Sequence, residues 1–512
     1  MSALLIPLSL LVTLLVTAYL YVKHSYSYWK RRGVPYLTPS FLFGTFGNSF
    51  QKKTSFGQDL ANMHKQTTEP FIGIYTSVRP ALLVRDPKII KDILVKDFQS
   101  FGHRGFNTNV DVDPMSDNVL LQQGDRWKRV RTQLSPAFSS GKLKGMFETI
   151  LRSGKSLDEF VGRYLNTNKS IEMREVFARF ATNIIVAVAF GIDIDCIKNP
   201  DCEFRKNGQK QFEPNMKNML RTNVGLMLPK LHKLLGLRFA DKEVGDFMID
   251  AVRQNIEYRE TNNVIRKDFF QMLMQLRNTG KIRDDDDDWS AKSSSLEKAI
   301  TLEETAAHAF LFFAGGFESS SSTMSFCMYE LAKHPDIQQR AYNDIVDALK
   351  AHGGKLTYEC VAEMKYIDHC IDESLRLHPP FPLAARQCTK EYRIPDTNVV
   401  IEKGTNVFFS TLGLHYDRKY YDEPEKFIPE RYAESNGAKS FLEMPNLTFG
   451  DGPRNCLGLR LGKLQSKIAI VLLLHKFKFE LDDMHKGKEL KINPISVVLA
   501  PTNGINLKVL SR

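Results

Sequence analysis

A cysteine near the C-terminal end lies in a loop that could hold a thiolate against a metal ion. Cys456 is flanked by Gly450, Gly452 and Gly458, which allow the backbone to approach a flat ligand and to point amide N–H groups at a sulfur anion. Arg454 lies two residues before the cysteine and could pair with an acidic group on the same ligand. Inert packing is the alternative for any of the seven cysteines, because a free cysteine is most often a small buried hydrophobe.

The residues after this loop predict a helix. Apolar side chains recur from Leu459 onward at helical spacing, at Leu461, Leu464 and Ile468. Cys456 is therefore expected directly before a helix N-terminus, where the helix dipole favours a thiolate over a thiol.

The stretch from Phe449 to Gly458 matches, at every fixed position, the Phe-x-x-Gly-x-Arg-x-Cys-x-Gly signature of cytochrome P450 enzymes, so the chain resembles a haem-thiolate protein. The resemblance implies a haem b cofactor whose iron takes Cys456 as its axial thiolate ligand, with Phe449 and Arg454 also at the cofactor. It further implies a mainly α fold, in which a large helical domain carries a small β-rich lobe.

Other segments of this family appear in the same order. Glu373 and Arg376 match its Glu-x-x-Arg motif, and Arg431 lies in a Pro-Glu-Arg-Tyr segment that resembles its Pro-Glu-Arg-Phe. The resemblance implies a buried triad that braces the cysteine loop, whereas the spacing alone also fits an ordinary surface ion pair. Arg386 stands where the family places an arginine that reaches a haem propionate; a solvated arginine is the alternative.

A long apolar helix is predicted between these segments and the N-terminal half. Thr301 and Glu304 form a capping box that opens it, and the apolar pattern continues to about Lys333. Residues 315–320 within it combine two glycines with a run of hydroxyls, which are poor helix formers. We therefore expect a strained turn there, with a serine-rich loop or an incidental kink as the alternative.

The same six residues resemble the oxygen-activation sequence of the family. By this resemblance Glu318 is the acid and Ser319 the alcohol that together deliver the protons needed for O–O bond cleavage. Most members carry threonine where this chain has Ser319. Serine keeps the hydroxyl but lacks the methyl that restricts its rotamer, so we expect looser coupling of electron flow to product.

A tryptophan and an arginine one helical turn apart supply further candidates for the cofactor site. Trp127 and Arg131 match the Trp-x-x-x-Arg segment of the family, and both side chains could donate to a propionate from one helix face. The alternative is a surface tryptophan beside a cation. Arg104 is another candidate propionate partner by alignment of the preceding loop.

The N-terminus predicts a membrane anchor. Residues 3–22 are 20 residues without a charge, and basic residues follow at Lys23 and 30–32, which keeps the rest of the chain cytosolic. A cleaved secretory peptide is the rival, but no basic residue precedes the apolar run and the cysteines make a poor disulfide framework. We expect an anchor over 1–22, a basic and proline-containing linker over 23–40 and a haem-thiolate catalytic domain over 41–512. In the family, this anchor implies the endoplasmic reticulum membrane.

The net charge of +11 comes from 70 basic and 59 acidic residues, and no motif supports nucleic-acid binding. In the family, the face nearest the cysteine receives electrons from an NADPH-cytochrome P450 reductase, and cytochrome b5 can use the same surface. We expect basic residues near the cofactor segments to steer this docking. They are Lys128, Arg129, Lys142, Lys144, Arg460, Lys463 and Lys467.

Over its whole length the chain resembles insect microsomal P450 enzymes that metabolise xenobiotics. This implies a monooxygenase that inserts one atom of O2 into lipophilic molecules such as plant toxins or insecticides, or into endogenous lipids. Candidate pocket residues are apolar, and they include Phe312, Phe313, Phe317, 381–384 and 495–498. A P450-type isomerase or dehydratase and a non-catalytic haem sensor are the alternatives, neither of which needs an acid and alcohol pair.

Overall fold

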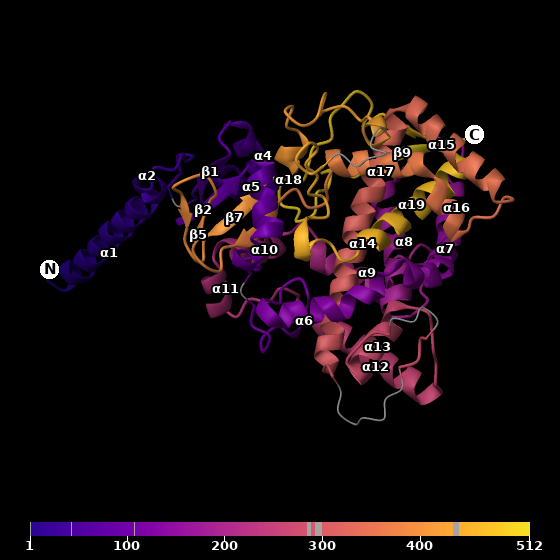
Figure 1. Cartoon of the computed structure of the whole chain (residues 1–512), viewed down its shortest axis with the longest axis horizontal. Helices are drawn as coiled ribbons and strands as arrows, with labels where there is room; N and C mark the ends of the chain where they lie inside the picture. The colour runs from indigo at the N-terminus through magenta and orange to yellow at the C-terminus, as the bar shows by residue number, and fades with distance from the viewer. Residues whose placement is uncertain (1, 42, 107, 284–287, 292–298, 434–439) are drawn as a thin grey trace.

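Helices form most of the chain in the computed structural model, which describes residues 2–41, 43–106, 108–283, 288–291, 299–433 and 440–512. A large helical part lies beside a smaller lobe that contains a sheet, and a long N-terminal helix projects from that lobe (Figure 1). The predicted mainly α fold with a small β-rich lobe is confirmed. The helices of the larger part are α6 (Gly124–Leu134), α7 (Ser140–Gly162), α8 (Met173–Ala189), α9 (Glu203–Phe212), α10 (Met216–Met227), α11 (Pro229–Leu234), α12 (Lys242–Asn262), α13 (Phe269–Thr279), α14 (Leu302–Lys333), α15 (Pro335–Ala351), α16 (Tyr358–Glu363), α17 (Lys365–Leu377) and α19 (Leu459–Lys476).

Helix α14 runs through the largest hydrophobic cluster, which also takes in residues of α7, α8, α12, α17 and α19. Its first turn carries the predicted capping box, in which Thr301 accepts from the Glu304 amide and Glu304 accepts from the Thr301 amide. A Cβ on Gly316 would overlap the side chain of Ile185, so the glycine lets α14 approach α8 closely.

The strained turn expected at residues 315–320 is absent, because α14 is continuous there. The hydroxyls of this region donate within the helix: Ser319 to the Gly315 carbonyl, and Thr323 to the Ser319 carbonyl over 2.8 Å. The run of serines therefore keeps helical hydrogen bonding, and burial against neighbouring helices compensates its low helix propensity.

The smaller lobe is built on a four-stranded sheet with the order β1-β2-β7-β4. Strands β2 and β7 are parallel, and the other neighbours are antiparallel. The elements of this lobe are β1 (Phe71–Thr76), β2 (Arg79–Val84), β4 (Ala384–Gln387), β7 (Asn406–Phe409), α3 (Gly47–Phe50), α4 (Phe56–Lys65), α5 (Pro87–Lys91) and α18 (Thr411–His415). Two smaller sheets have the orders β3-β9-β8 and β5-β6. Their strands are β3 (Ser170–Glu172), β5 (Tyr392–Arg393), β6 (Val400–Ile401), β8 (Phe477–Leu481) and β9 (Asn506–Ser511).

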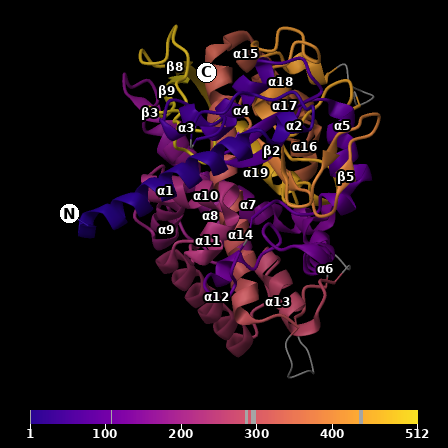
Figure 2. The same cartoon turned by 90° about the vertical axis from the view of Figure 1, so that its left-hand side faces the viewer.

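The N-terminal helix α1 (Ser2–Tyr26) stands away from the body of the protein (Figure 2). Its segment Pro7–Tyr26 has 20 residues, a mean hydropathy of 1.4 and almost no buried surface, so it is long and apolar enough to cross a membrane. Part of the segment 23–40 packs against the sheet. Trp29, in the short helix α2 (Tyr28–Arg31), is fully buried, and its indole N–H donates to the Ile74 carbonyl over 3.1 Å.

One pair of cysteines is bridged, although the scattered cysteines were expected to make a poor disulfide framework. Cys196 and Cys202 form a disulfide in the segment between α8 and α9. The other five cysteines, all within the described part of the chain, are free; four of them are buried and Cys456 is exposed.

Candidate cofactor-binding site

The cysteine loop is closed by a hydrogen bond from the Cys456 amide to the Phe449 carbonyl, over 2.7 Å. Its 3-10 turn η6 (Gly452–Arg454) lies against the π-helical turn η1 (Asp92–Lys96). Gly452 has φ +70°, and a Cβ there would overlap the carbonyl oxygen of Leu94. The position therefore requires glycine both for its left-handed backbone and for this close approach. Helix α19 begins three residues after Cys456, as predicted.

The surroundings of the Cys456 thiol offer a sulfur anion both hydrogen-bond and charge stabilisation. Desolvation by the surrounding protein raises the pKa of Cys456, while the Gly458 amide and the charges of Arg131 and Arg104 act in the opposite direction. An exposed thiol of this kind differs from the four buried free cysteines, for which packing is a sufficient explanation.

Helix α19, which follows the cysteine loop, contacts α14 at Gly316 and Ser320. Gln465 of α19 donates to the Gly316 carbonyl over 2.9 Å and also to the Ser320 hydroxyl. A Cβ on Gly315 would meet no atom within 4 Å, so open space lies beside this turn. Ser319 shares that helix face, because it is one turn further along α14.

Four arginines gather around the loop, and all four were predicted from the sequence. Arg104 donates to the Leu120 and Arg454 carbonyls, each over 2.9 Å. Arg131 donates to the Asn455 carbonyl over 2.9 Å. Arg454 donates to the Gln122 carbonyl over 2.7 Å, and Arg386 donates to the Ala385 carbonyl over 2.8 Å.

These cations have no anionic partner within the described ranges, where no carboxylate forms an ion pair with any of the four. The Nε–H groups of Arg386 and Arg454 are buried and donate no hydrogen bond within the described part of the protein. Burial and the neighbouring arginines lower the pKa of Arg454 to about 8 and that of Arg386 to about 9, and burial lowers the pKa of Arg104 to about 10. A ligand that brings carboxylates would relieve this unfavourable state, so the residues fit the propionates of a haem.

Two aromatic residues from the predicted set lie at the same place. Trp127 is buried, and the guanidinium of Arg454 stands 4.2 Å from the centre of its ring. Phe449 is partly buried against the main core. A donation from the Trp127 indole to a propionate stays a prediction.

Glu318 and Ser319 are neighbours in sequence but make different contacts. The buried carboxylate of Glu318 pairs with Arg174 of α8. Ser319 is only half-buried, and its hydroxyl donates to the Gly315 carbonyl on the open face of α14. The structure therefore holds the acid toward α8 and the alcohol toward the open space.

Glu373 and Arg376 of the predicted triad are buried and Arg431 is partly buried, so the alternative of a surface ion pair is wrong. Glu373 and Arg376 are fully buried and joined by two hydrogen bonds of 2.7 Å. Arg431 donates to the same carboxylate over 3.1 Å.

Sequence reasoning missed His415, which connects this triad to the cysteine segment. Its Nδ1 lies 2.9 Å from the Arg376 carbonyl, and its Nε2 accepts from the Leu447 amide over 3.2 Å. Leu447 lies two residues before Phe449, at the start of the loop. No local pattern marks a lone histidine at the end of α18, so only its long-range contacts reveal this position.

The candidate pocket phenylalanines are mostly core residues. Phe313 and Phe317 are fully buried, and Phe313 packs against Phe190 and Phe204 with ring centres 6.3 and 6.0 Å apart. Phe312 packs against Phe138 and Phe269. Assigning Phe313 and Phe317 to pocket walls is therefore wrong, because helical spacing on α14 places them toward α8 and α9.

The predicted basic docking set also needs correction. Lys142 is buried, Lys467 is buried and paired with Asp368 over 2.9 Å, and Lys463 pairs with Asp372 over 2.5 Å. Lys128 and Arg129 remain exposed on α6. Arg460 is exposed at the start of α19, and Lys144 is exposed but paired with Glu359.

A mainly helical fold with an exposed cysteine in a glycine-rich loop, ringed by arginines that lack anions, defines the class of haem-thiolate proteins. A family model described as "Cytochrome P450" matches residues 36–509. The chain is 39% identical over 508 residues to probable cytochrome P450 6d5 of Drosophila melanogaster, covering 98% of this chain and 99% of that protein. It is 37% identical over 518 residues to cytochrome P450 6d3 of Musca domestica, covering 99% of each. It is 38% identical over 507 residues to cytochrome P450 6k1 of Blattella germanica, covering 98% and 96%.

The chain belongs to the cytochrome P450 family. It is a monooxygenase of the oxidoreductase class, and the family binds haem b through a cysteine thiolate.

Proposed function

We propose that this protein is a membrane-anchored monooxygenase that inserts one atom of O2 into lipophilic small molecules, including xenobiotics such as plant toxins and insecticides. Electrons come from NADPH through a cytochrome P450 reductase, with cytochrome b5 as a second donor. The similarity to insect P450 proteins supports this assignment, and endogenous lipids or hormones are a second substrate class.

The observation that carries the proposal is the exposed Cys456 beside four arginines without carboxylate partners in the described chain. In this proposal Cys456 ligates the iron, and Arg104, Arg131, Arg386 and Arg454 bind the propionates. Trp127 and Phe449 border the same cofactor. Haem with a thiolate ligand supplies the oxygen activation when it is bound.

Proton delivery is assigned to Glu318 and Ser319. The Ser319 hydroxyl lies on the face of α14 that borders open space, where it can hold a water molecule or a substrate group by a hydrogen bond. Arg174 pairs with Glu318 and holds its carboxylate toward α8. Proton transfer from Glu318 therefore requires its carboxylate to leave Arg174 and turn toward Ser319.

Helix α1 and a group of exposed basic residues support the proposed membrane location and the proposed reductase partner. Helix α1 is proposed to cross the endoplasmic reticulum membrane, with Lys23 and residues 30–32 on its cytosolic side. The exposed side chains of Lys128, Arg129 and Arg460 are proposed to steer docking of an acidic reductase on the cysteine side of the molecule.

Labelled oxygen tests this function. The full-length protein would be reconstituted in lipid vesicles with NADPH and a cytochrome P450 reductase, and a panel of lipophilic substrates would be incubated under 18O2. We expect products that carry one 18O atom and depend on NADPH. Products without label, or formed equally without NADPH, would contradict the monooxygenase assignment and favour an isomerase.

A further inference from the structure

We propose that Cys196 and Cys202 form a reversible thiol–disulfide site that responds to peroxide and glutathione and controls the order of the first turn of α9. The proposal rests on the proposed cytosolic orientation of the domain. It does not depend on the substrate or on turnover.

The bridge joins the segment that follows α8 to the start of α9. Cys196 is fully buried, and its amide donates to the side-chain oxygen of Asn183 in α8 over 2.7 Å. Cys202 is partly exposed and is the N-cap residue of α9. The Cα atoms of the two cysteines lie 5.8 Å apart, so the disulfide ties the beginning of α9 to the body of α8.

Two arguments favour a reversible disulfide over a permanent structural one. Disulfides in cytosolic proteins are usually transient, because glutathione and thioredoxin keep thiols reduced. The two cysteines lie only 6 positions apart in the sequence, and a short loop restricts the unfolded chain less than a long one. The bridge therefore contributes less to global stability than one that closes a long loop, and we expect its main effect to be local.

The local effect falls on a helix that covers α14. Phe204 in the first turn of α9 packs against Phe190 and Phe313, with ring centres 5.0 and 6.0 Å apart. A Cβ on Gly208 would lie 3.0 Å from the ring of Phe317, so α9 and α14 approach closely there. Phe313 and Phe317 belong to the α14 segment that includes Gly315.

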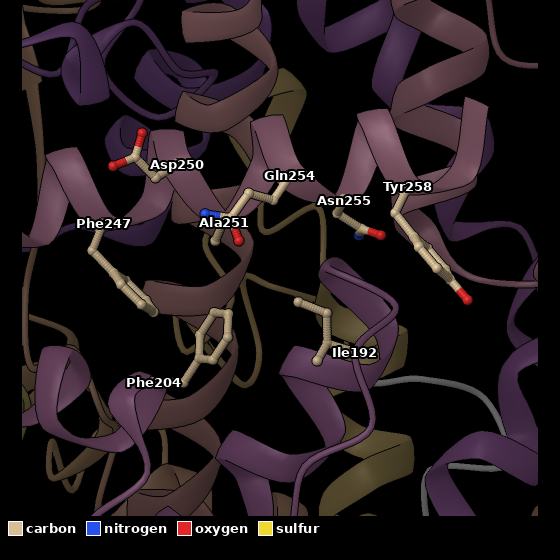
Figure 3. A pocket seen from close by; sticks show the side chains of 8 residues that line it. All are labelled: Ile192, Phe204, Phe247, Asp250, Ala251, Gln254, Asn255 and Tyr258. Atoms are coloured by element: carbon tan, nitrogen blue, oxygen red, sulfur yellow. The ribbon is translucent and has the colours of Figure 1, made fainter. Parts of the chain in front are cut away.

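The outer side of the same turn packs against α12, where the rings of Phe204 and Phe247 lie edge to face with their centres 5.0 Å apart. A pocket of about 360 Å³ lies between Phe204 and Ile192 on one side and α12 on the other. Figure 3 shows Phe247 of α12 and Phe204 on the same side of this pocket, with their rings turned toward one another. Arg205 pairs with Glu175 of α8 over 2.5 Å, so cleavage of the disulfide loosens the first turn without detaching the helix.

The oxidation step balances with hydrogen peroxide as the oxidant. The Cys202 thiolate, at a helix N-terminus and partly exposed, attacks one peroxide oxygen and becomes a sulfenic acid; the O–O bond breaks, and the departing hydroxide takes up the proton that the thiol had released, as the first water. The Cys196 thiol then attacks the Cys202 sulfur, its proton and the hydroxyl leave as the second water, and the S–S bond forms. Two glutathione molecules reverse the step, and they are oxidised to glutathione disulfide.

Glutathione titration with hydrogen exchange tests the proposal. Purified full-length protein would be equilibrated in buffers of increasing glutathione disulfide to glutathione ratio. The bridge would be quantified by alkylation and mass spectrometry, and amide exchange would be followed over residues 203–207. We expect the bridge to open and close within the titration, with exchange in this turn about tenfold faster in the reduced form.

Two cysteine variants distinguish an effect of the Cys196–Cys202 bridge from a general effect of removing a cysteine. Cys202→Ser should show fast exchange in every buffer, whereas Cys360→Ser, which removes a different buried cysteine, should respond like the wild type. The proposal is overturned if the bridge never forms, if it persists at the most reducing ratio, or if exchange in the turn is the same in both states. Because none of these readouts uses substrate, failure of the monooxygenase assignment would leave them unchanged.

Discussion

His415 joins Arg376 to Leu447: its Nδ1 lies 2.9 Å from the Arg376 carbonyl, and its Nε2 accepts from the Leu447 amide over 3.2 Å. The imidazole must be neutral to donate on one side and accept on the other. Through it, the buried pair of Glu373 and Arg376 holds the segment that leads into the cysteine loop.

Replacing His415 with phenylalanine should destabilise the protein by about 2–3 kcal/mol. The change leaves the buried Leu447 amide and the Arg376 carbonyl without a partner, and each such loss costs roughly 1–3 kcal/mol. Urea unfolding followed by circular dichroism would measure the loss, and absorbance would measure retained haem. His475→Phe, at an exposed position of α19, is the matched control. Equal effects of the two substitutions would contradict the bridging role.

The same histidine should make stability depend on pH. Burial lowers the pKa of His415 to about 3, whereas an unfolded histidine titrates near about 6.5. Because the folded-state pKa is the lower one, the unfolded chain binds the proton first, and stability is lost as pH falls from about 6.5 toward 3. Between about pH 6 and 5, the wild type should lose about 1 kcal/mol more than His415→Gln. Parallel losses in urea unfolding would show that His415 does not titrate in this way.

Arg386 should matter for haem retention and not for the fold. Its cation is buried without a carboxylate partner in the described chain, so Arg386→Met should leave the stability of the haem-free protein unchanged or slightly higher. Transfer of haem to an acceptor globin should become about tenfold faster, because a charge-assisted contact to a propionate is lost. Arg129→Met removes an exposed arginine as the control, and Arg386→Lys should partly restore retention. An unchanged transfer rate would rule out the propionate role.

Glu318 and Ser319 should control the coupling efficiency, which is the ratio of product formed to NADPH consumed. Glu318→Gln removes the ionisable group that Arg174 holds, and we expect the ratio of product formed to NADPH consumed to fall by about 10²-fold. Ser319→Thr restricts the hydroxyl rotamer and should raise that ratio. Ser325→Ala, further along α14 with its hydroxyl bonded to the Ser321 carbonyl, is the control. A ratio that Glu318→Gln leaves at the wild-type value would exclude Glu318 as the proton source.

Local signals in the sequence predicted the elements that carry the site. The capping box at Thr301 fixed the start of α14, and apolar spacing after Leu459 fixed α19, because both signals depend on neighbours within one or two turns. The four arginines were predicted by family resemblance, and the structure adds that they lack anionic partners.

Contacts between distant segments could not be predicted in the same way. Arg174 and Glu318 are paired although they lie 144 positions apart in the sequence. The Arg376 carbonyl and His415, which are also in contact, lie 39 positions apart. Trp29 is buried only because Gly73 lacks a side chain, which is a property of the packed sheet. The core positions of Phe313 and Phe317 likewise depend on how α9 and α8 lie against α14.

The carbon monoxide difference spectrum of the reduced, full-length protein tests the haem-thiolate assignment most directly. Wild-type protein should show the strongly red-shifted Soret band of a thiolate-ligated haem. Cys456→Ala should lose that band, while Cys360→Ala, at a buried free cysteine, should keep it. Absence of the band from well-folded wild type, or its persistence in Cys456→Ala, would contradict Cys456 as the iron ligand.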